Sequence, residues 1–259
     1  MRRRSREAPR SWRGRGYDMA RTVAMSPLAA SLLTRSSVPS RYREAVRTNQ
    51  RIRVLLAAEL RPDSNCLDIG SYRGDVLREM VRRAPLGHHI AWEPLPYMAS
   101  ALRRRFPTVE VREAAVSDHV GRAEFSNVRS RPTYSGLRLR PDAPSRDVQS
   151  INVRTETVDG ALPKDFVPHL VKIDVEGALV QVLSGALSIL TKHRPLVLFE
   201  YGHLARQTYG TTFDDVYQLL HDECRLGIYD LYGNGPFEVA QLEEIDDRSD
   251  WIARPLVDA

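Results

Sequence analysis

The sequence has few cysteines and no long hydrophobic run. Its two cysteines, Cys66 and Cys224, lie far apart and form neither a metal-ligand pattern nor a redox pattern. No apolar stretch approaches the roughly 20 residues that cross a bilayer, so we expect no membrane partner. A reduced, cytoplasmic protein is the simplest prediction from these absences.

Several motifs of nucleotide chemistry are also missing. The chain contains no G-x-x-x-x-G-K-[ST] segment, which argues against a nucleotide triphosphatase. It lacks both G-x-G-x-x-G and a Tyr-x-x-x-Lys pair, which argues against an NAD-dependent oxidoreductase.

The positive charge is concentrated in the first residues. Eight arginines lie within residues 1–25, whereas the net charge of the whole chain is only +5. The remainder is therefore close to neutral, which argues against a nucleic-acid partner. We expect residues 1–38 to form a disordered, Arg-rich tail and residues 39–259 to form the folded domain.

Strand and helix patterns alternate along the folded part, after an N-terminal helix predicted at 39–61. This alternation predicts an α/β fold with a doubly wound, mostly parallel seven-strand sheet and helices on both faces. The expected strands of the sheet lie near 65–69, 88–94, 108–116, 169–175, 194–202, 225–233 and, as an edge strand, 249–257. The long polar stretch at 128–149 predicts either a lid over the acceptor or a mobile spacer.

The turn after the first strand is the most informative segment. It reads LDIGSYRGD (67–75), with Asp68 before two glycines, and Glu93 ends the next strand. In such sheets, ligands bind beyond the carboxyl ends of the strands, and an acid at the second strand bonds ribose hydroxyls. Glycines there let the backbone approach a ligand closely. The arrangement predicts an adenosine-containing ligand.

The same turn indicates which adenosine compound is bound. Tyr72 stands where a middle glycine would be expected, so we predict no pyrophosphate cradle. A carboxylate before the turn attracts a cationic group and repels phosphate. S-adenosylmethionine carries an amine and a sulfonium and has no phosphate, so we predict it as the cofactor. Alternatively, Asp68 caps a helix and Glu93 faces solvent.

The chain resembles the FkbM family of S-adenosylmethionine-dependent methyltransferases over about residues 65–256. The blocks that carry the resemblance are LDIGSYRGD (67–75), WEPLP (92–96), EAAVSDHVG (113–121) and KIDVEGALVQVLSGALSILTKHRPLVLFE (172–200). The resemblance implies a Rossmann-like class I methyltransferase fold and methylation of a hydroxyl on a small molecule, sugar or natural product. An N-methyltransferase, a macromolecule methyltransferase and a non-catalytic cofactor-binding domain of the same fold stay open as alternatives.

The resemblance also implies which residues bind the cofactor. It places Glu93 on the ribose, Ala115 with neighbouring Val116 near the adenine, and Asp174 beside the methionine part. The full set of implied cofactor-binding residues is Asp68, Gly70, Ser71, Gly74, Glu93, Ala115, Val116 and Asp174.

Methylation of an alcohol needs a group that removes the hydroxyl proton. His203 follows the fifth predicted strand, and histidine ordinarily titrates near pH ~6.5, which suits a base. A surface loop histidine is the alternative. Asp174 and Glu200 are further catalytic candidates, although Asp174 could instead cap a helix or bind magnesium. No second strong set of oxygen ligands accompanies Asp174, so we predict no metal site. The acceptor and the oligomeric state are left open.

Overall fold

The computed structural model describes residues 40–144, 146–245 and 249–256. The expected tail, residues 1–38, lies outside these ranges. The chain divides into two compact units, residues 1–54 and 55–259. The described part of the first unit, residues 40–54, belongs to helix α3 (Ser40–Glu59), whose bounds fall within the helix predicted for 39–61.

The second unit contains a seven-stranded sheet with the order β3-β2-β1-β7-β8-β10-β9. All its neighbouring pairs are parallel except those of β10, which is antiparallel to both β8 and β9. The doubly wound, mostly parallel seven-strand sheet is therefore confirmed. Its strands are β1 (Cys66–Ile69), β2 (His89–Trp92), β3 (Glu110–Arg112), β7 (Leu170–Ile173), β8 (Leu196–Glu200), β9 (Leu226–Asp230) and β10 (Asp250–Pro255).

The position of β10 differs from the expected edge strand. The structure inserts β10 between β8 and β9, so that β9 forms the edge. Trp251, Ile252 and Ala253 in β10 are all buried. An edge position would leave much of this apolar surface in water, so burial favours the inner position.

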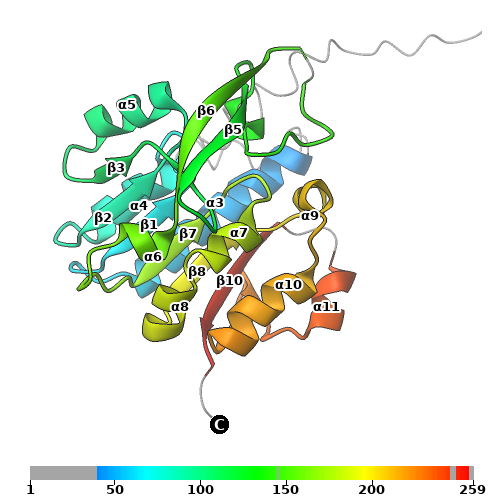
Figure 1. Ribbon diagram of the computed structural model, residues 1–259. Helices are drawn as coiled ribbons and strands as arrows, with labels where there is room; N and C mark the ends of the chain where they lie inside the picture. The colour runs from blue at the N-terminus through cyan, green and yellow to red at the C-terminus, as the bar shows by residue number, and fades with distance from the viewer. Residues whose placement is uncertain (1–39, 145, 246–248, 257–259) are drawn as a thin grey trace, which may run out of the picture. The chain divides into compact units, whose positions relative to one another are not determined.

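Helices connect the strands in two directions from β1. Toward β3 they are α4 (Asp75–Arg83) and α5 (Pro96–Arg105); toward β9 they are α6 (Val158–Ala161), α7 (Leu179–Ser184), α8 (Leu187–His193), α9 (His203–Tyr209), α10 (Phe213–Tyr217), the π-helix η2 (Gln218–Glu223) and α11 (Val239–Glu244). Because parallel crossovers are right-handed, helices on the two routes cover opposite faces of the sheet. Helices α6, α7, α8 and α10 share one apolar cluster with the sheet, and Figure 1 shows α7, α8 and α10 on the same side of it.

A second, three-stranded sheet stands beside the first. It contains β4 (Ala115–Val116), β5 (Gly121–Val128) and β6 (Val148–Glu156), in the order β4-β6-β5. The single strand expected at 108–116 is thus divided between β3 and β4, which belong to different sheets. Strands β5 and β6 pair from Gly121↔Thr155 to Val128↔Val148, so most of the polar stretch 128–149, residues 129–147, is the connection between them. Figure 1 shows this pair rising away from the main sheet.

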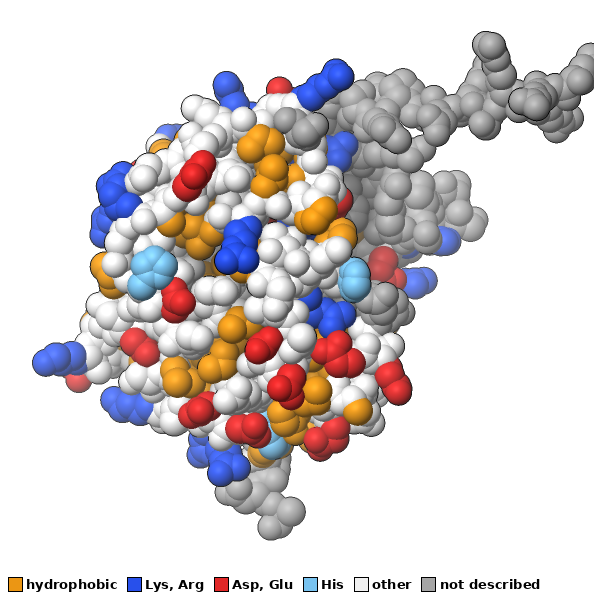
Figure 2. Space-filling model, turned by 45° about the vertical axis from the view of Figure 1, so that its right-hand side comes forward, with side chains coloured by type: hydrophobic (Ala, Val, Ile, Leu, Met, Phe, Trp, Pro, Cys, Tyr) orange, Lys and Arg blue, Asp and Glu red, His pale blue; other side chains and the backbone are white. Residues whose placement is uncertain are grey.

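Further features of the described residues are the hydropathy of their helices, the charge of one face and the state of the two cysteines. None of their helices combines the length and apolar content that a membrane crossing requires. On the face shown in Figure 2, acidic side chains gather in the lower part, whereas basic ones are scattered. Cys66 and Cys224 are free and buried, and burial raises the pKa of Cys66 to about 12.

Candidate active site

The first turn of the sheet, residues 70–74, packs against the end of β7. Gly70 has φ +76°, and a Cβ atom there would lie 1.8 Å from the carbonyl oxygen of Asp174. The amide of Asp174 in turn donates to the carbonyl of Ile69 at 3.0 Å. The glycine at position 70 is therefore required by this close approach of two chain segments, as well as by its backbone angle.

The amides of this turn donate to acceptors of the protein itself. Gly70 and Ser71 both donate to the carbonyl of Trp92, each at 3.0 Å, and Gly74 donates to Ser71 at 2.7 Å. The Tyr72 amide donates to Glu93 Oε2 at 2.8 Å, and Tyr72 itself has φ +50°. Phosphate sites at such turns use several converging amides. Because these four amides are already engaged within the protein, they are not available to bind a phosphate.

Glu93 is fixed at the end of β2 by two backbone amides. Its Oε1 accepts from Leu95 at 2.9 Å and its Oε2 from Tyr72 at 2.8 Å. The side chain is buried, and this burial raises the pKa of Glu93 to about 7, against the opposing effects of the two amides and of Lys172. Each carboxylate oxygen has a second lone pair, so Glu93 can still accept hydrogen bonds from a ligand.

Asp68 does not face an open cavity, because its exposed fraction is 1%. The register of β1 and β7 places it opposite Lys172, whose Nζ lies 3.1 Å from Asp68 Oδ1. The same ammonium is 2.6 Å from the carbonyl oxygen of Gly70 and 3.6 Å from Asp174 Oδ2. Asp68 thus forms an ion pair inside the protein.

The sequence predictions did not include Lys172, although a lysine within an apolar strand indicates a buried charge. Three of the 38 basic residues are lysines, and this one interrupts the apolar strand Leu170–Ile173. A charged side chain inside a buried strand needs a partner of opposite charge. That requirement points to an acid on a neighbouring strand.

The remaining cofactor-binding candidates lie around this turn with different roles. The Ser71 hydroxyl donates to the carbonyl of Asp68 at 2.8 Å, so it holds the turn. Ala115 belongs to an apolar cluster with Leu95, two residues beyond Glu93, and the cluster also contains Phe125. The Val116 side chain packs into the main core instead. An apolar wall therefore lies beside the Glu93 carboxylate.

Comparison with known proteins bears on this site directly. The profile of the Methyltransferase FkbM domain matches residues 68–227, which is more than half of the chain. The chain belongs to the FkbM methyltransferase family. The resemblance inferred from the sequence motifs is thereby confirmed.

Solved structures similar to this FkbM domain include three other methyltransferases. A methyltransferase FkbM from Methylobacillus flagellatus KT has a TM-score of 0.51 and 13% identity, with 93% of this chain and 58% of that chain covered. A TehB-like SAM-dependent methyltransferase from Corynebacterium glutamicum ATCC 13032 Kitasato has a TM-score of 0.44 and 10% identity, covering 88% and 97%. The plantazolicin methyltransferase BpumL, in complex with a pentazolic desmethylPZN analog and SAH, has a TM-score of 0.44 and 10% identity, covering 95% and 100%.

The similarity to the Methylobacillus flagellatus structure supports the class I methyltransferase fold that we expected. This chain spans little more than half the length of that protein. No curated protein matches the chain.

The catalytic candidates of the FkbM domain lie at the carboxyl ends of β7 and β8. Ile173 pairs with Phe199, so the residues that follow them, Asp174 and Glu200, end neighbouring strands. Glu200 also pairs with Asp250 across the β8–β10 ladder. His203 is exposed and is the first residue of α9, three positions beyond Glu200.

His203 opens onto a surface hollow of about 640 Å³ whose walls come mainly from α9 and the turn after it. The hollow is lined by His203, Arg206, Gln207, Gly210, Thr211, Thr212 and Glu243. Within it, Glu243 accepts hydrogen bonds from Arg206 Nη1 at 2.7 Å and from the Phe213 amide at 2.8 Å. The described residues contain no group of three or more His, Cys, Asp or Glu side chains arranged to hold a metal ion.

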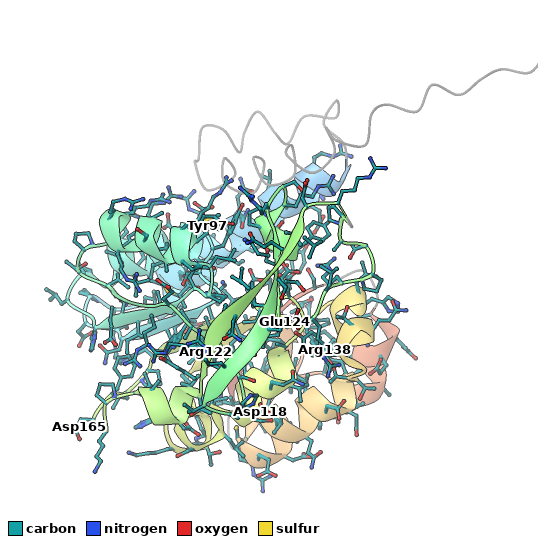
Figure 3. The ribbon with its side chains drawn as sticks, turned by 45° about the horizontal axis from the view of Figure 1, so that its top comes forward. Tyr97, Asp118, Arg122, Glu124, Arg138 and Asp165 are labelled. Carbon is teal, nitrogen blue, oxygen red and sulfur yellow. The ribbon has the colours of Figure 1, made fainter. Side chains whose placement is uncertain are left out.

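The connection between β5 and β6 lies against the turn that follows β7. Arg140 Nη1 is 2.7 Å from Glu176 Oε2, and Arg140 also pairs with Asp142 at 3.0 Å. Two residues earlier in the same connection, the Arg138 guanidinium lies 5.0 Å from the ring centroid of Tyr209 at the end of α9. Figure 3 labels the Arg138 side chain. Burial raises the pKa of Tyr209 to about 12, against the opposing effect of Arg138. The connection therefore touches two segments that follow strands β7 and β8.

Proposed function

We propose that this FkbM-domain protein transfers the methyl group of S-adenosylmethionine to a hydroxyl group of a small molecule, sugar or natural product. The observation that carries the proposal is the hydrogen bonding of the first turn, residues 70–74, and the charge of the side chains around it. Four of its amides donate to the protein itself, while carboxylates end the strands around it. Such a site favours a cationic adenosyl ligand without phosphate over a nucleotide phosphate.

The residues present fit this cofactor. Glu93 is held rigidly and retains lone pairs for the two ribose hydroxyls. The cluster with Leu95 and Ala115 offers an apolar surface to the adenine. Asp174, whose side chain is 23% exposed at the end of β7, offers a carboxylate to the amine of the methionine part. Gly70 and Gly74 shape the backbone between these groups.

When bound, the cofactor supplies a methyl group that is already activated by its sulfonium. The chain's own residues then have to align the acceptor hydroxyl and remove its proton. We assign proton removal to His203, with Glu200 as the nearby carboxylate that ends β8. The connection at 128–149, anchored through Arg140, is assigned the role of a lid over the acceptor.

The test of the proposed function is methyl transfer by the purified full-length protein. S-adenosylmethionine labelled in its methyl group is incubated with the protein and fractionated cell metabolites, and labelled products are identified. A labelled methyl ether supports the proposal, whereas a labelled amine would replace it with N-methylation. Cofactor binding by calorimetry without transfer to any fraction would favour a non-catalytic domain.

Replacement of His203 by alanine should lower kcat by about 10²–10⁴-fold, because removal of a general base typically has this effect. The affinity for S-adenosylmethionine, measured by calorimetry, should change less than about threefold. Gln207→Ala, which alters the same hollow one helical turn later, is the matched control and should retain turnover. Equal kcat values in the two variants would remove His203 from the reaction.

Replacement of Arg140 by methionine should loosen the connection, since it removes the contacts to Glu176 and Asp142. Charge-assisted contacts of this kind contribute on the order of 1.5–3 kcal/mol, so the population of molecules in which the connection has detached should increase about tenfold or more. Subtilisin should cut within residues 129–147 correspondingly faster, and the acceptor KM should rise. Arg129→Met, at an exposed position in the same connection, is the control. Identical cleavage rates would show that Arg140 does not anchor the lid.

A further inference from the structure

Lys172 sits at the centre of the site without having been assigned a function. Its side chain is 8% exposed and lies on β7 between the apolar residues Val171 and Ile173. A buried ammonium is stable only when hydrogen-bond acceptors and opposite charges surround it. Its ammonium lies near the carbonyl oxygens of Gly70, at 2.6 Å, and Ile69, at 3.5 Å.

Two carboxylates compete for this ammonium, and they are not equivalent. Asp68 Oδ1 is 3.1 Å away and Asp174 Oδ2 is 3.6 Å away. The Asp68 side chain is 1% exposed, whereas that of Asp174 is 23% exposed. The nearer and fully buried carboxylate is therefore the natural partner of Lys172, and the farther one remains within reach of a ligand.

We infer that Lys172 is a positioning residue that neutralises Asp68 and holds the Gly70 carbonyl, so that Asp174 receives the amine of the cofactor. This inference rests on the proposed function and assigns a different role to each acidic residue of the site. Asp68 stabilises the turn through its ion pair with Lys172, which also donates to the Gly70 carbonyl. Asp174 makes the charged contact with the methionine part, and Glu93 holds the ribose.

The ion pair itself can be tested without any ligand. Lys172→Met leaves the Asp68 carboxylate buried without its ammonium, so the melting temperature should fall by about 6 °C or more. Adding Asp68→Asn removes the second charge and should restore the melting temperature to within about 2 °C of the wild type. Equal melting of Lys172→Met and wild type, or no rescue by the second substitution, would overturn the pair.

The assignment of the amine is tested by binding, with S-adenosylmethionine and adenosine as probes. In Asp68→Asn the Lys172 ammonium loses its nearer partner and competes for Asp174, so the affinity for S-adenosylmethionine should fall about tenfold. Lys172→Met in the Asp68→Asn/Lys172→Met double variant removes that competitor and should restore the affinity to within about threefold of the wild type. Asp174→Asn should lose about tenfold or more of this affinity, while its affinity for adenosine, which lacks the amino-acid part, changes less than about threefold. A tenfold loss in the double variant, with adenosine binding intact, would show that Asp68 receives the amine.

These measurements separate the inference from the proposed function. If wild-type protein binds adenosine but not S-adenosylmethionine, the proposed function fails and the assignment of Asp174 fails with it. The melting experiment still decides whether Lys172 and Asp68 form a stabilising pair.

Discussion

Replacement of Gly70 by alanine should destabilise the protein strongly. The added Cβ would lie 1.8 Å from the Asp174 carbonyl oxygen, so one of the two backbone segments has to move. The residue also has φ +76°, where a side chain adds about 1–2 kcal/mol. With overpacking of typically 1–3 kcal/mol, we expect a loss of about 2–5 kcal/mol in the free energy of unfolding. Denaturant unfolding and thermal melting measure this loss.

The control for this variant is Gly210→Ala. Gly210 has a similar angle, φ +66°, but no atom lies within 4 Å of a Cβ built there. It should therefore show the cost of the backbone angle alone, about 1–2 kcal/mol. The difference between the two variants isolates the close approach of the turn to β7. Equal losses would contradict the packing described for Gly70 and Asp174.

Replacement of Glu93 by glutamine should weaken the binding of S-adenosylmethionine by about 10- to 100-fold. Hydrogen bonds to a charged group contribute about 1.5–3 kcal/mol, and the amide places a donor where both carboxylate oxygens now accept. Calorimetry measures the affinity. The control is Glu113→Gln, an exposed glutamate paired with Arg103, which should leave the affinity unchanged. Wild-type affinity in Glu93→Gln would remove Glu93 from the cofactor site.

The same residue should make cofactor binding depend on pH. Burial raises the pKa of Glu93 from 4.5 to about 7, so below neutral pH the Glu93 carboxyl group is protonated when no ligand is bound. Ribose hydroxyls donate best to the ionised carboxylate, so affinity should rise as pH increases to about 7 and then level off. In Glu93→Gln this rise should disappear. A rise of equal size in that variant would assign the titration to another group.

The effect of Glu93 on stability has the opposite sign. Because its pKa in the folded protein is above the unfolded value, the folded state binds the proton more tightly. Its contribution is therefore fully present below about pH 4.5 and is lost as pH rises through about 7. Ligand affinity and the intrinsic stability of the empty protein should thus change in opposite directions over this range.

The sequence was informative wherever local pattern and chain order sufficed. The alternation of apolar strands and helices gave the doubly wound sheet, because each strand must bury its apolar residues and each crossover must be right-handed. The turn glycines and Glu93 were recognisable because strand order alone brings them to one edge of the sheet. The FkbM motifs identified the family because they are continuous blocks of sequence that can be read without the tertiary structure.

Tertiary structure decided which side chains meet across strands that are distant in sequence. The pairing of β1 with β7 brings Lys172 to Asp68, although about 100 residues separate them, and a buried charge then selects its partner. The burial of Trp251 placed β10 between β8 and β9. The contact of Arg140 with Glu176 likewise depends on where the β5–β6 pair leaves the main sheet. Local sequence pattern determines which strands and helices form, whereas the packing of the strands and the register between distant ones determine strand order and which charges neutralise each other.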